Sequence, residues 1–283
     1  MNSTCIVTDS AAQYPYPSFP GRDSIHVLTL PIQIGGQIRE DYQEIKVSSL
    51  PHIWEKPDPP QIQPPPQEGI HHLLTALNQK YSDIIILTLS SRLNGTYVAM
   101  ENAVQNFTGS ARIFLVDTQT ISIGQGYLVE QAARGISSGL SAAEIEQDIR
   151  KSIPHIFNLL CTPSLSYLFH SGIIDQPQST VSDFYNLYPL FVLEDGQFTP
   201  LLKVRNYRAA LESFQEFLGE FENLKHISII QGGTIPPQDI RMIKQFCDEI
   251  FPDTPFSEHQ LNSYLGTLFG PAFLGLFIAE NNT

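Results

Sequence analysis

Short apolar segments that end in polar side chains recur along the chain. Four of them are long enough for buried strands and too short and too β-branched for helices: 5–8, 84–89, 113–116 and 227–230. The residues that follow these segments carry hydroxyl, carboxylate or amide groups: Asp9-Ser10, Ser90-Ser91, Asp117-Thr118 and Gln231-Gly232-Gly233. If the first three strands are parallel, their polar ends lie along one edge of a sheet, where open α/β sheets bind ligands. We take this edge as the candidate site.

Helical periodicity separates these strands. Apolar positions recur at helical spacing in the segments 68–80, 96–107, 123–138, 141–153, 206–224 and 236–251. Ser141 followed by Glu144 forms a capping box, which marks the start of one helix. Strands that alternate with helices predict an α/β protein whose N-terminal part is a mainly parallel sheet flanked by helices.

The chain of 283 residues is long enough for two α/β domains. The stretch KPDPPQIQPPP, 56–66, is rich in prolines, which exclude a helix and a central strand and predict a stiff surface connection. The character of the sequence changes near 156–162, after the helix predicted over 141–153. We therefore predict an N-terminal α/β domain over 1–155 and a C-terminal α/β domain over 156–283.

Composition excludes several classes of protein. A net charge of -13 with only 16 Lys and Arg argues against nucleic-acid binding, which needs a concentrated basic surface.

Cys5, Cys161 and Cys247 are odd in number and far apart, so we expect buried thiols. His71 and His72 are adjacent in a predicted helix and cannot face one metal ion, so no metal site is expected. Neither a signal peptide nor a membrane-spanning run is evident, and we expect a cytoplasmic protein.

Two further motifs have the residue types of catalytic or phosphate-binding sites. Gly232-Gly233-Thr234 before a predicted helix has the form of a phosphate cradle, but it lacks the P-loop lysine and the GxGxxG spacing. Ser90 or Ser91 could be the nucleophile of a serine hydrolase, but no GxSxG elbow surrounds them and no general base is identifiable. Serines at such a place also commonly cap the following helix.

Six motifs in order along the chain resemble the DegV family of fatty-acid-binding proteins. They are IVTDSAAQYP (6–15), LTLSSRLNGTY (87–97), FLVDTQTISIGQG (114–126), YLFHSGII (167–174), FVLEDGQFTPLLKVRNYRAALE (191–212) and FGPAFLGL (269–276). The resemblance implies a two-domain α/β fold that buries one long-chain fatty acid, with the carboxylate in the cleft between the domains. It also implies a carrier without a cofactor and without catalytic residues, which presents the acyl group to a partner fatty acid kinase for phospholipid synthesis.

The resemblance also implies which residues bind. Ser91, Ser90 and the free N–H groups after Gly95 would hold the carboxylate, as a helix N-terminus favours negative charge. The resemblance further implies that the partner kinase binds at a small cationic group in this acidic chain, formed by Lys203, Arg205 and Arg208. From the residues alone, the default interpretation of this group is a solvated face.

Three departures from the family pattern fall on polar positions. Gln61 to Pro64 stand where the family has Thr-Ser-Gln-Pro, so the head-group contact is missing or rebuilt through Gln61, with Gln63 beside it. Thr267 is retained in the C-terminal motif, but Leu268 replaces the family histidine. Ser171-Gly172-Ile173 replaces Gly-Gly-Arg and removes a cation.

These departures leave three interpretations of the ligand site. In the first, Ser91 and backbone N–H groups hold a fatty acid in a more apolar cleft. In the second, the ligand is a different lipid with a less charged head. In the third, the protein's own side chains fill the pocket, with Leu268, Phe269 and Phe273 as the bulky candidates.

Overall fold

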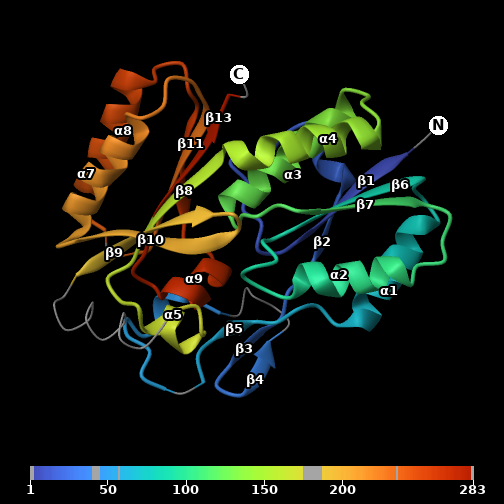
Figure 1. Ribbon diagram of the computed structural model, residues 1–283, viewed down its shortest axis with the longest axis horizontal. Coiled ribbons are helices and arrows are strands. Elements are labelled where there is room, and N and C mark those ends of the chain that lie inside the picture. Colours follow the sequence, from blue (N-terminus) through green and yellow to red (C-terminus); the bar gives the residue numbers. More distant parts are fainter. Residues whose placement is uncertain (1–2, 40–44, 57, 175–186, 234, 282–283) are drawn as a thin grey trace. The chain divides into compact units, whose positions relative to one another are not determined.

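The computed structural model describes residues 3–39, 45–56, 58–174, 187–233 and 235–281 (Figure 1). The chain forms two compact units. Unit 1 contains Met1–Ile32, Ile62–Pro154 and Asp195–Gln197, and unit 2 contains Gln33–Gln61, His155–Glu194 and Phe198–Thr283. The predicted ranges 1–155 and 156–283 differ from these bounds mainly in residues 33–61, which pack with unit 2.

Hydrogen bonds within unit 2 explain where residues 45–54 belong. The Tyr167 hydroxyl donates to the carbonyl of Pro51 at 2.6 Å, and the Ser166 hydroxyl accepts from the N–H of Trp54 at 2.8 Å. Farther along the chain, the Ser263 hydroxyl donates to the carbonyl of Ile45 at 3.0 Å. These partners lie more than a hundred residues apart in sequence, so no local pattern indicates them.

Unit 1 is built on a parallel sheet with the strand order β2-β1-β6-β7. Its strands are β1 (Thr4–Asp9), β2 (Ile25–Leu28), β6 (Asp83–Thr88) and β7 (Arg112–Asp117). Every residue of β6 is buried, because helices cover both faces of the sheet. The predicted parallel arrangement is confirmed.

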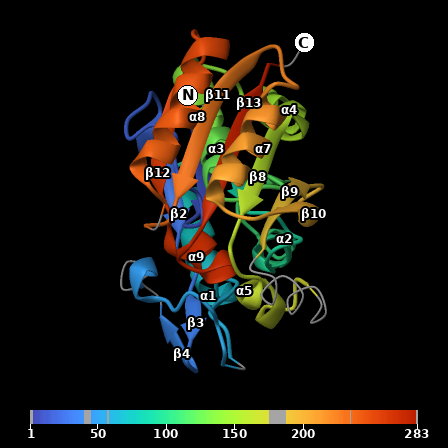
Figure 2. The same cartoon turned by 90° about the vertical axis from the view of Figure 1, so that its left-hand side faces the viewer.

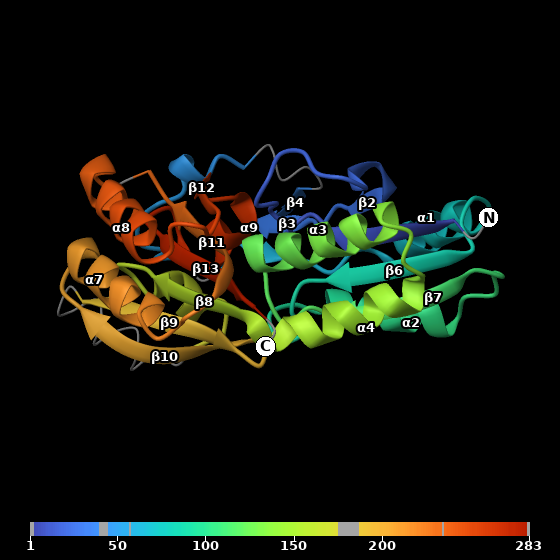
Figure 3. The same cartoon turned by 90° about the horizontal axis from the view of Figure 1, so that it is seen from above.

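The helices of unit 1 are α1 (Gln67–Asn78), α2 (Thr96–Gln105), α3 (Ile123–Ser137) and α4 (Ala142–Ser152), with a 3₁₀ turn, η1 (Arg22–Ser24). Figures 1 and 3 show α3 and α4 on one face of the sheet, and Figure 1 shows α1 and α2 on the other. Ile70 and Leu74 of α1 pack with Cys5 and Val7 of β1 in one core. The capping box predicted at Ser141 is present at the start of α4.

Unit 2 contains a mixed sheet with the strand order β10-β9-β8-β13-β11-β12. Its strands are β8 (Ile156–Cys161), β9 (Tyr188–Glu194), β10 (Gln197–Val204), β11 (Leu224–Gln231), β12 (Phe256–Gln260) and β13 (Leu274–Glu280). Strand β11 runs parallel to β12 and antiparallel to β13.

The long helices of unit 2, α7 (Tyr207–Leu218) and α8 (Pro237–Ile250), lie side by side over this sheet (Figure 2). Shorter helices are α5 (Ser166–His170) and α9 (Ser263–Phe269), with 3₁₀ turns η3 (Val47–Ser49) and η4 (Ile153–His155). The prediction of a helix over 206–224 is wrong at its end: α7 ends at Leu218, where Gly219 caps it, and Leu224 opens β11.

Three short strands form a separate small sheet with the order β4-β3-β5. They are β3 (Ile32–Ile34), β4 (Gln37–Arg39) and β5 (Gln61–Ile62). Strand β5 lies at the edge of this sheet, the place in a sheet that a proline-rich stretch tolerates.

The cysteines and the lengths of the helices bear on two further expectations from the sequence. Cys5, Cys161 and Cys247 are buried and unpaired, as expected. Within the described residues, no helix has both the length and the apolarity needed to cross a membrane.

Candidate functional site

Two aspartates hold together the carboxyl ends of the strands of unit 1. Asp9, at the end of β1, accepts hydrogen bonds from the N–H groups of Leu89 at 2.8 Å and Ala11 at 3.1 Å. Asp117, at the end of β7, accepts from the N–H groups of Ser91 at 3.1 Å and Gln119 at 3.0 Å. The predicted convergence of these three polar strand ends is confirmed, and each aspartate both caps its own turn and anchors the loop after β6.

Asp9 is fully buried, and its environment changes its acidity. Burial penalises the carboxylate and raises the pKa of Asp9 to about 6, although hydrogen bonds from the Gln125 side chain and from the N–H of Leu89 act in the opposite direction. The carboxyl group therefore becomes protonated on mild acidification. A ligand anion at this edge would meet less negative charge there below pH 6.

The Ser90 hydroxyl is engaged within unit 1. It donates to the carbonyl of Gly196 at 2.6 Å and accepts from the N–H of Arg92 at 3.2 Å. Gly196 has φ +79°, and a Cβ at that position would overlap the Ser90 hydroxyl. Because its only proton is bonded to Gly196, Ser90 fixes the turn at 195–197, and its predicted contact with a ligand stays a prediction. Neither Ser90 nor Ser91 accepts a hydrogen bond from the first turn of α2 within the described residues, as a helix cap would.

Ser91 differs from its neighbour. Its N–H is bound to Asp117, but its partly buried hydroxyl has no hydrogen-bond partner among the residues that the structure describes. Ser91 therefore has an uncommitted hydroxyl at the carboxyl edge of the sheet. This is the property that a residue binding an oxyanion needs.

The start of α2 offers further donors. Gly95 is its N-cap. The side-chain Oδ1 of Asn94 accepts from the N–H of Thr96 at 2.8 Å, while the side-chain Nδ2 of Asn94 donates to the carbonyl of Ile62 at 2.7 Å. In the described part of the chain, the N–H groups of Tyr97 and Val98 have no acceptor. The loop 91–98 thus combines a free hydroxyl with the positive end of a helix dipole.

The remaining predicted ligand residues divide between the two units. Gln63 belongs to unit 1, and its N–H donates to the carbonyl of Pro31 at 2.8 Å. Gln61 is exposed on β5 and belongs to unit 2. Thr267, also in unit 2, is buried and donates to the carbonyl of Tyr264 at 2.7 Å, and Leu268 beside it is buried. That these residues share one ligand with Ser91 stays a prediction.

A cluster of aromatic rings surrounds Phe269 in unit 2. Phe198 and Phe273 each lie with their ring centroids 5.0 Å from that of Phe269, and Phe191 lies at 6.5 Å. All four side chains are buried. The interpretation in which the protein's own side chains fill the pocket depends on whether this cluster can separate around a lipid, and it stays open.

The predicted partner-binding residues are exposed. Lys203 lies on β10, an edge strand of its sheet, and Arg205 follows that strand. Arg208 lies on α7 at 3.6 Å from the Glu212 carboxylate, a solvated pair of little energetic weight. Lys203 also borders a pocket of about 270 Å³ that includes Leu201 and Leu202, which are 51% and 39% exposed.

The contacts of the two serines do not resemble those of a hydrolase. Neither Ser90 nor Ser91 has a hydrogen bond to a histidine within the described residues, the arrangement that activates a serine nucleophile. In the same part of the chain, no three His, Cys, Asp or Glu side chains gather closely enough to hold a metal ion.

Sequence reasoning missed two residues of this edge. Asn94 joins the 61–64 stretch to the start of α2, and its place just before a helix N-cap is a signal that could have indicated it. Gln125, inside α3, donates to the Thr8 hydroxyl at 3.1 Å. For Gln125, the sequence shows only that a polar residue lies on an apolar helix face. This pattern does not identify Thr8 as its hydrogen-bond partner.

Comparison with known proteins gives consistent results. A family model described as "Uncharacterised protein, DegV family" matches residues 3–281. A DegV domain-containing protein of Caldanaerobacter subterraneus subsp. tengcongensis is 27% identical, over 99% of this chain and 100% of that protein. A DegV domain-containing protein of Staphylococcus aureus strain COL is 24% identical over the same shares.

Solved structures share the fold. A fatty-acid-binding DegV family protein from Streptococcus agalactiae superposes with a TM-score of 0.84 at 18% identity, over 100% of both chains. The fatty acid kinase (Fak) B3 protein of Streptococcus pneumoniae, loaded with linoleic acid, superposes with a TM-score of 0.84 at 16% identity, over 99% of this chain and 100% of that one. The expected α/β fold is thereby confirmed.

Proposed function

Because the chain belongs to the DegV family, we propose that it binds one long-chain fatty acid and presents the carboxylate to a partner fatty acid kinase. In this proposal the protein is a carrier and the partner performs the chemistry. Solved relatives with the same fold are described as fatty-acid-binding, and one is loaded with linoleic acid.

The observation that carries the proposal is the loop 91–98. A carboxylate placed there would accept from the free Ser91 hydroxyl and from the unpaired N–H groups of Tyr97 and Val98, and the dipole of α2 favours its charge. Hydrogen bonds to an ionised group contribute about 1.5–3 kcal/mol each. The head group would thus be oriented by few contacts.

The acyl tail would supply most of the affinity. Burying about fourteen methylenes at about 0.8 kcal/mol each gives on the order of 11 kcal/mol before the costs of association. Loss of a single head-group donor would therefore loosen the ligand without abolishing binding.

The replacement of the family histidine by Leu268 bears on the choice of ligand. A buried leucine neither donates a hydrogen bond nor carries charge, so fewer groups are left to recognise the head. A free fatty acid held by Ser91 and α2 is the proposal; a lipid with a less charged head is the second candidate, favoured by this one substitution.

The site of kinase docking is proposed at Lys203, Arg205 and Arg208. Their exposure next to Leu201 and Leu202 supports this, because apolar side chains beside cations are typical of protein interfaces. We expect the double substitution Lys203→Glu with Arg205→Glu to weaken capture of the kinase. Lys151→Glu, at an exposed lysine of α4, is the matched control.

Native mass spectrometry of the purified protein, followed by extraction of whatever is bound, tests the proposal directly. A single long-chain fatty acid near unit occupancy is expected, with lower retention in Ser91→Ala and unchanged retention in Ser138→Ala, an exposed serine at the end of α3. A protein that carries no lipid and refuses added fatty acid would refute the proposal and support the filled-pocket interpretation.

A further inference from the structure

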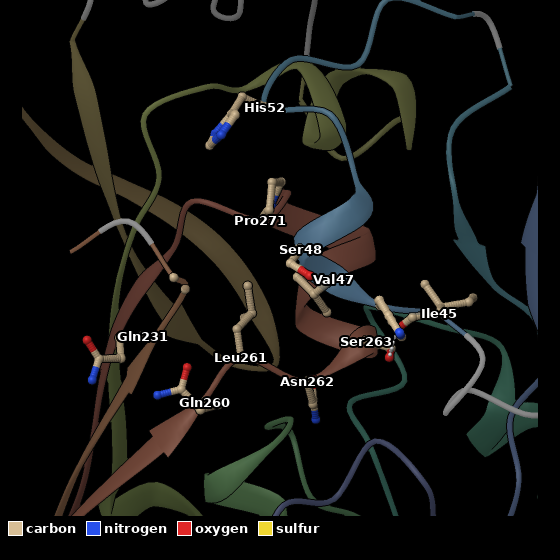
Figure 4. A pocket seen from close by; sticks show the side chains of 13 residues that line it. Ile45, Val47, Ser48, His52, Gln231, Gln260, Leu261, Asn262, Ser263 and Pro271 are labelled. Carbon is tan, nitrogen blue, oxygen red and sulfur yellow. Dashed lines mark hydrogen bonds between the residues drawn. The ribbon is translucent and has the colours of Figure 1, made fainter.

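A second pocket opens within unit 2, at the carboxyl ends of β11 and β12 (Figure 4). Its volume is about 570 Å³, within the range of small-molecule sites. The two strands are parallel, with Gln231 opposite Gln260. The chain leaves β11 toward α8 and leaves β12 into α9, and in open α/β sheets such a divergence beyond the strand ends leaves a crevice for a ligand.

The opposite wall of the pocket comes from residues 45–52. The hydrogen bond from Ser263 to the carbonyl of Ile45 fastens this segment to α9. Val47 packs so closely on Gly266 that a Cβ there would lie 3.0 Å from the Val47 methyl carbons. In the turn η3, the N–H of Ser49 donates a hydrogen bond to the carbonyl of Lys46 at 2.8 Å. This bond fixes the backbone that carries Lys46 and Ser48.

Several polar side chains line this pocket without being used by the protein. Gln231 is partly buried at the end of β11, and its amide makes no hydrogen bond within the described residues. The same holds for the side chains of Lys46, Ser48 and His52 in that part of the chain. Figure 4 shows the amides of Gln231 and Gln260 on one side of the pocket and Ser48 across from them, with Leu261 between.

The charge of the lining is unusual for this chain. The whole protein has 29 acidic and 16 basic residues, yet none of the 13 residues that line the pocket in the described part of the chain is acidic, and they include Lys46 and His52. Lysine, hydroxyl and amide groups that line a pocket with no carboxylate among its described residues suit an oxyanion. Apolar side chains complete the wall: Ile45, Val47, Leu261 and Pro271.

We propose that this pocket binds a small organic anion, bearing a carboxylate or a phosphate, at a site separate from the fatty acid. The oxyanion lies near Lys46 and Ser48, the apolar wall covers the carbon skeleton, and the Gln231 amide bonds a polar group of the ligand. This inference does not depend on the proposed fatty-acid binding.

Isothermal titration of the full chain with citrate, AMP and inorganic phosphate tests it. We expect saturable binding of citrate or of AMP, which distinguishes the two sources of the oxyanion. Lys46→Gln should weaken binding by about tenfold or more, since a charge-assisted hydrogen bond is lost. Lys225→Gln, at an exposed lysine on the opposite end of β11, should leave it unchanged.

A second variant blocks the space without touching the polar groups. Gly233 lines the pocket, a Cβ there would meet no atom of the described residues within 4 Å, and the backbone does not require glycine, so Gly233→Leu adds bulk at the pocket wall without backbone strain. We expect it to abolish binding of the anion while the fold and the lipid content stay as in the wild type.

Three results would overturn the proposal. The first is the absence of saturable binding for all three probes. The second is equal affinity in Gly233→Leu and the wild type. The third is displacement of the anion by added oleate in equimolar amount, which would make the pocket part of the lipid site. Because lipid content is measured separately, failure of this site and failure of the proposed carrier function are distinguishable.

Discussion

The adjacent serines at the end of β6 should respond in opposite ways to the same substitution. Ser90 is fully buried. Its hydroxyl donates a hydrogen bond to the carbonyl of Gly196 at 2.6 Å and accepts one from the N–H of Arg92 at 3.2 Å. Ser90→Ala leaves a buried carbonyl without its donor, which costs about 1–3 kcal/mol. Ser91→Ala removes a hydroxyl that has no partner among the described residues, so its effect on unfolding should stay within about 0.5 kcal/mol.

Urea unfolding of lipid-free protein, followed by circular dichroism, measures the stability of both variants. Native mass spectrometry of the same variants purified without delipidation measures ligand retention. We expect Ser90→Ala to lower the urea midpoint, and Ser91→Ala to keep it while losing lipid. If Ser91→Ala destabilises the protein as much as Ser90→Ala, or if Ser90→Ala unfolds like the wild type, the assignment of a structural and a binding serine is wrong.

Further predictions concern acidity, backbone strain and ligand choice. Burial raises the pKa of Asp9 from 3.8 to about 6, so the folded protein holds a proton that the unfolded chain releases in this window. The free energy of unfolding should therefore fall by about 2 kcal/mol from pH 4 to pH 6. Urea unfolding at both pH values should show the stability difference between wild type and Asp9→Asn changing by this amount, and a difference independent of pH would contradict it. Gly270 has φ +76°, and a Cβ there would lie 2.7 Å from the ring of Tyr167. Gly270→Ala should therefore lower the stability measured by thermal unfolding by at least about 1 kcal/mol. The control Gly69→Ala, in α1, should raise that stability slightly. Leu268→His should raise the preference for oleate over methyl oleate in competition measured by native mass spectrometry, and an unchanged ratio would show that this position does not contact the head group.

Strands β1 and β6 were predictable because each is an apolar run buried on both faces, and β7 was predictable from its apolar run alone. Two other edge strands, β2 and β12, were not predicted: β12 reads FSEHQ, and its polar residues carry no strand period that a search for apolar runs detects. The start of α4 was predictable from Ser141 and Glu144, whose contacts are local. The end of α7 was not, because the apolar spacing continues past Leu218 although Gly219 ends the helix.

The candidate site shows the same limit. Parallel strands bring Asp9, Ser91 and Asp117 to one edge, and this follows from the order of elements alone. Which atoms pair is decided by three-dimensional packing: Ser90 bonds to Gly196, 106 residues later in the chain. The sequence therefore indicated the place of the site but could not separate the engaged serine from the free one.

The edge of the unit 1 sheet has few unpaired donors left for an added anion, and this restricts how a carboxylate can bind there. Asp9 and Asp117 already occupy the N–H groups of Leu89 and Ser91, and they contribute negative charge of their own. The proton of Ser90 is bound as well. Among the described donors at this edge, the Ser91 hydroxyl, the buried Thr88 hydroxyl and the first N–H groups of α2 remain unpaired. Because the Ser91 hydroxyl and the first N–H groups of α2 lie on one loop, they would hold a carboxylate from a single side.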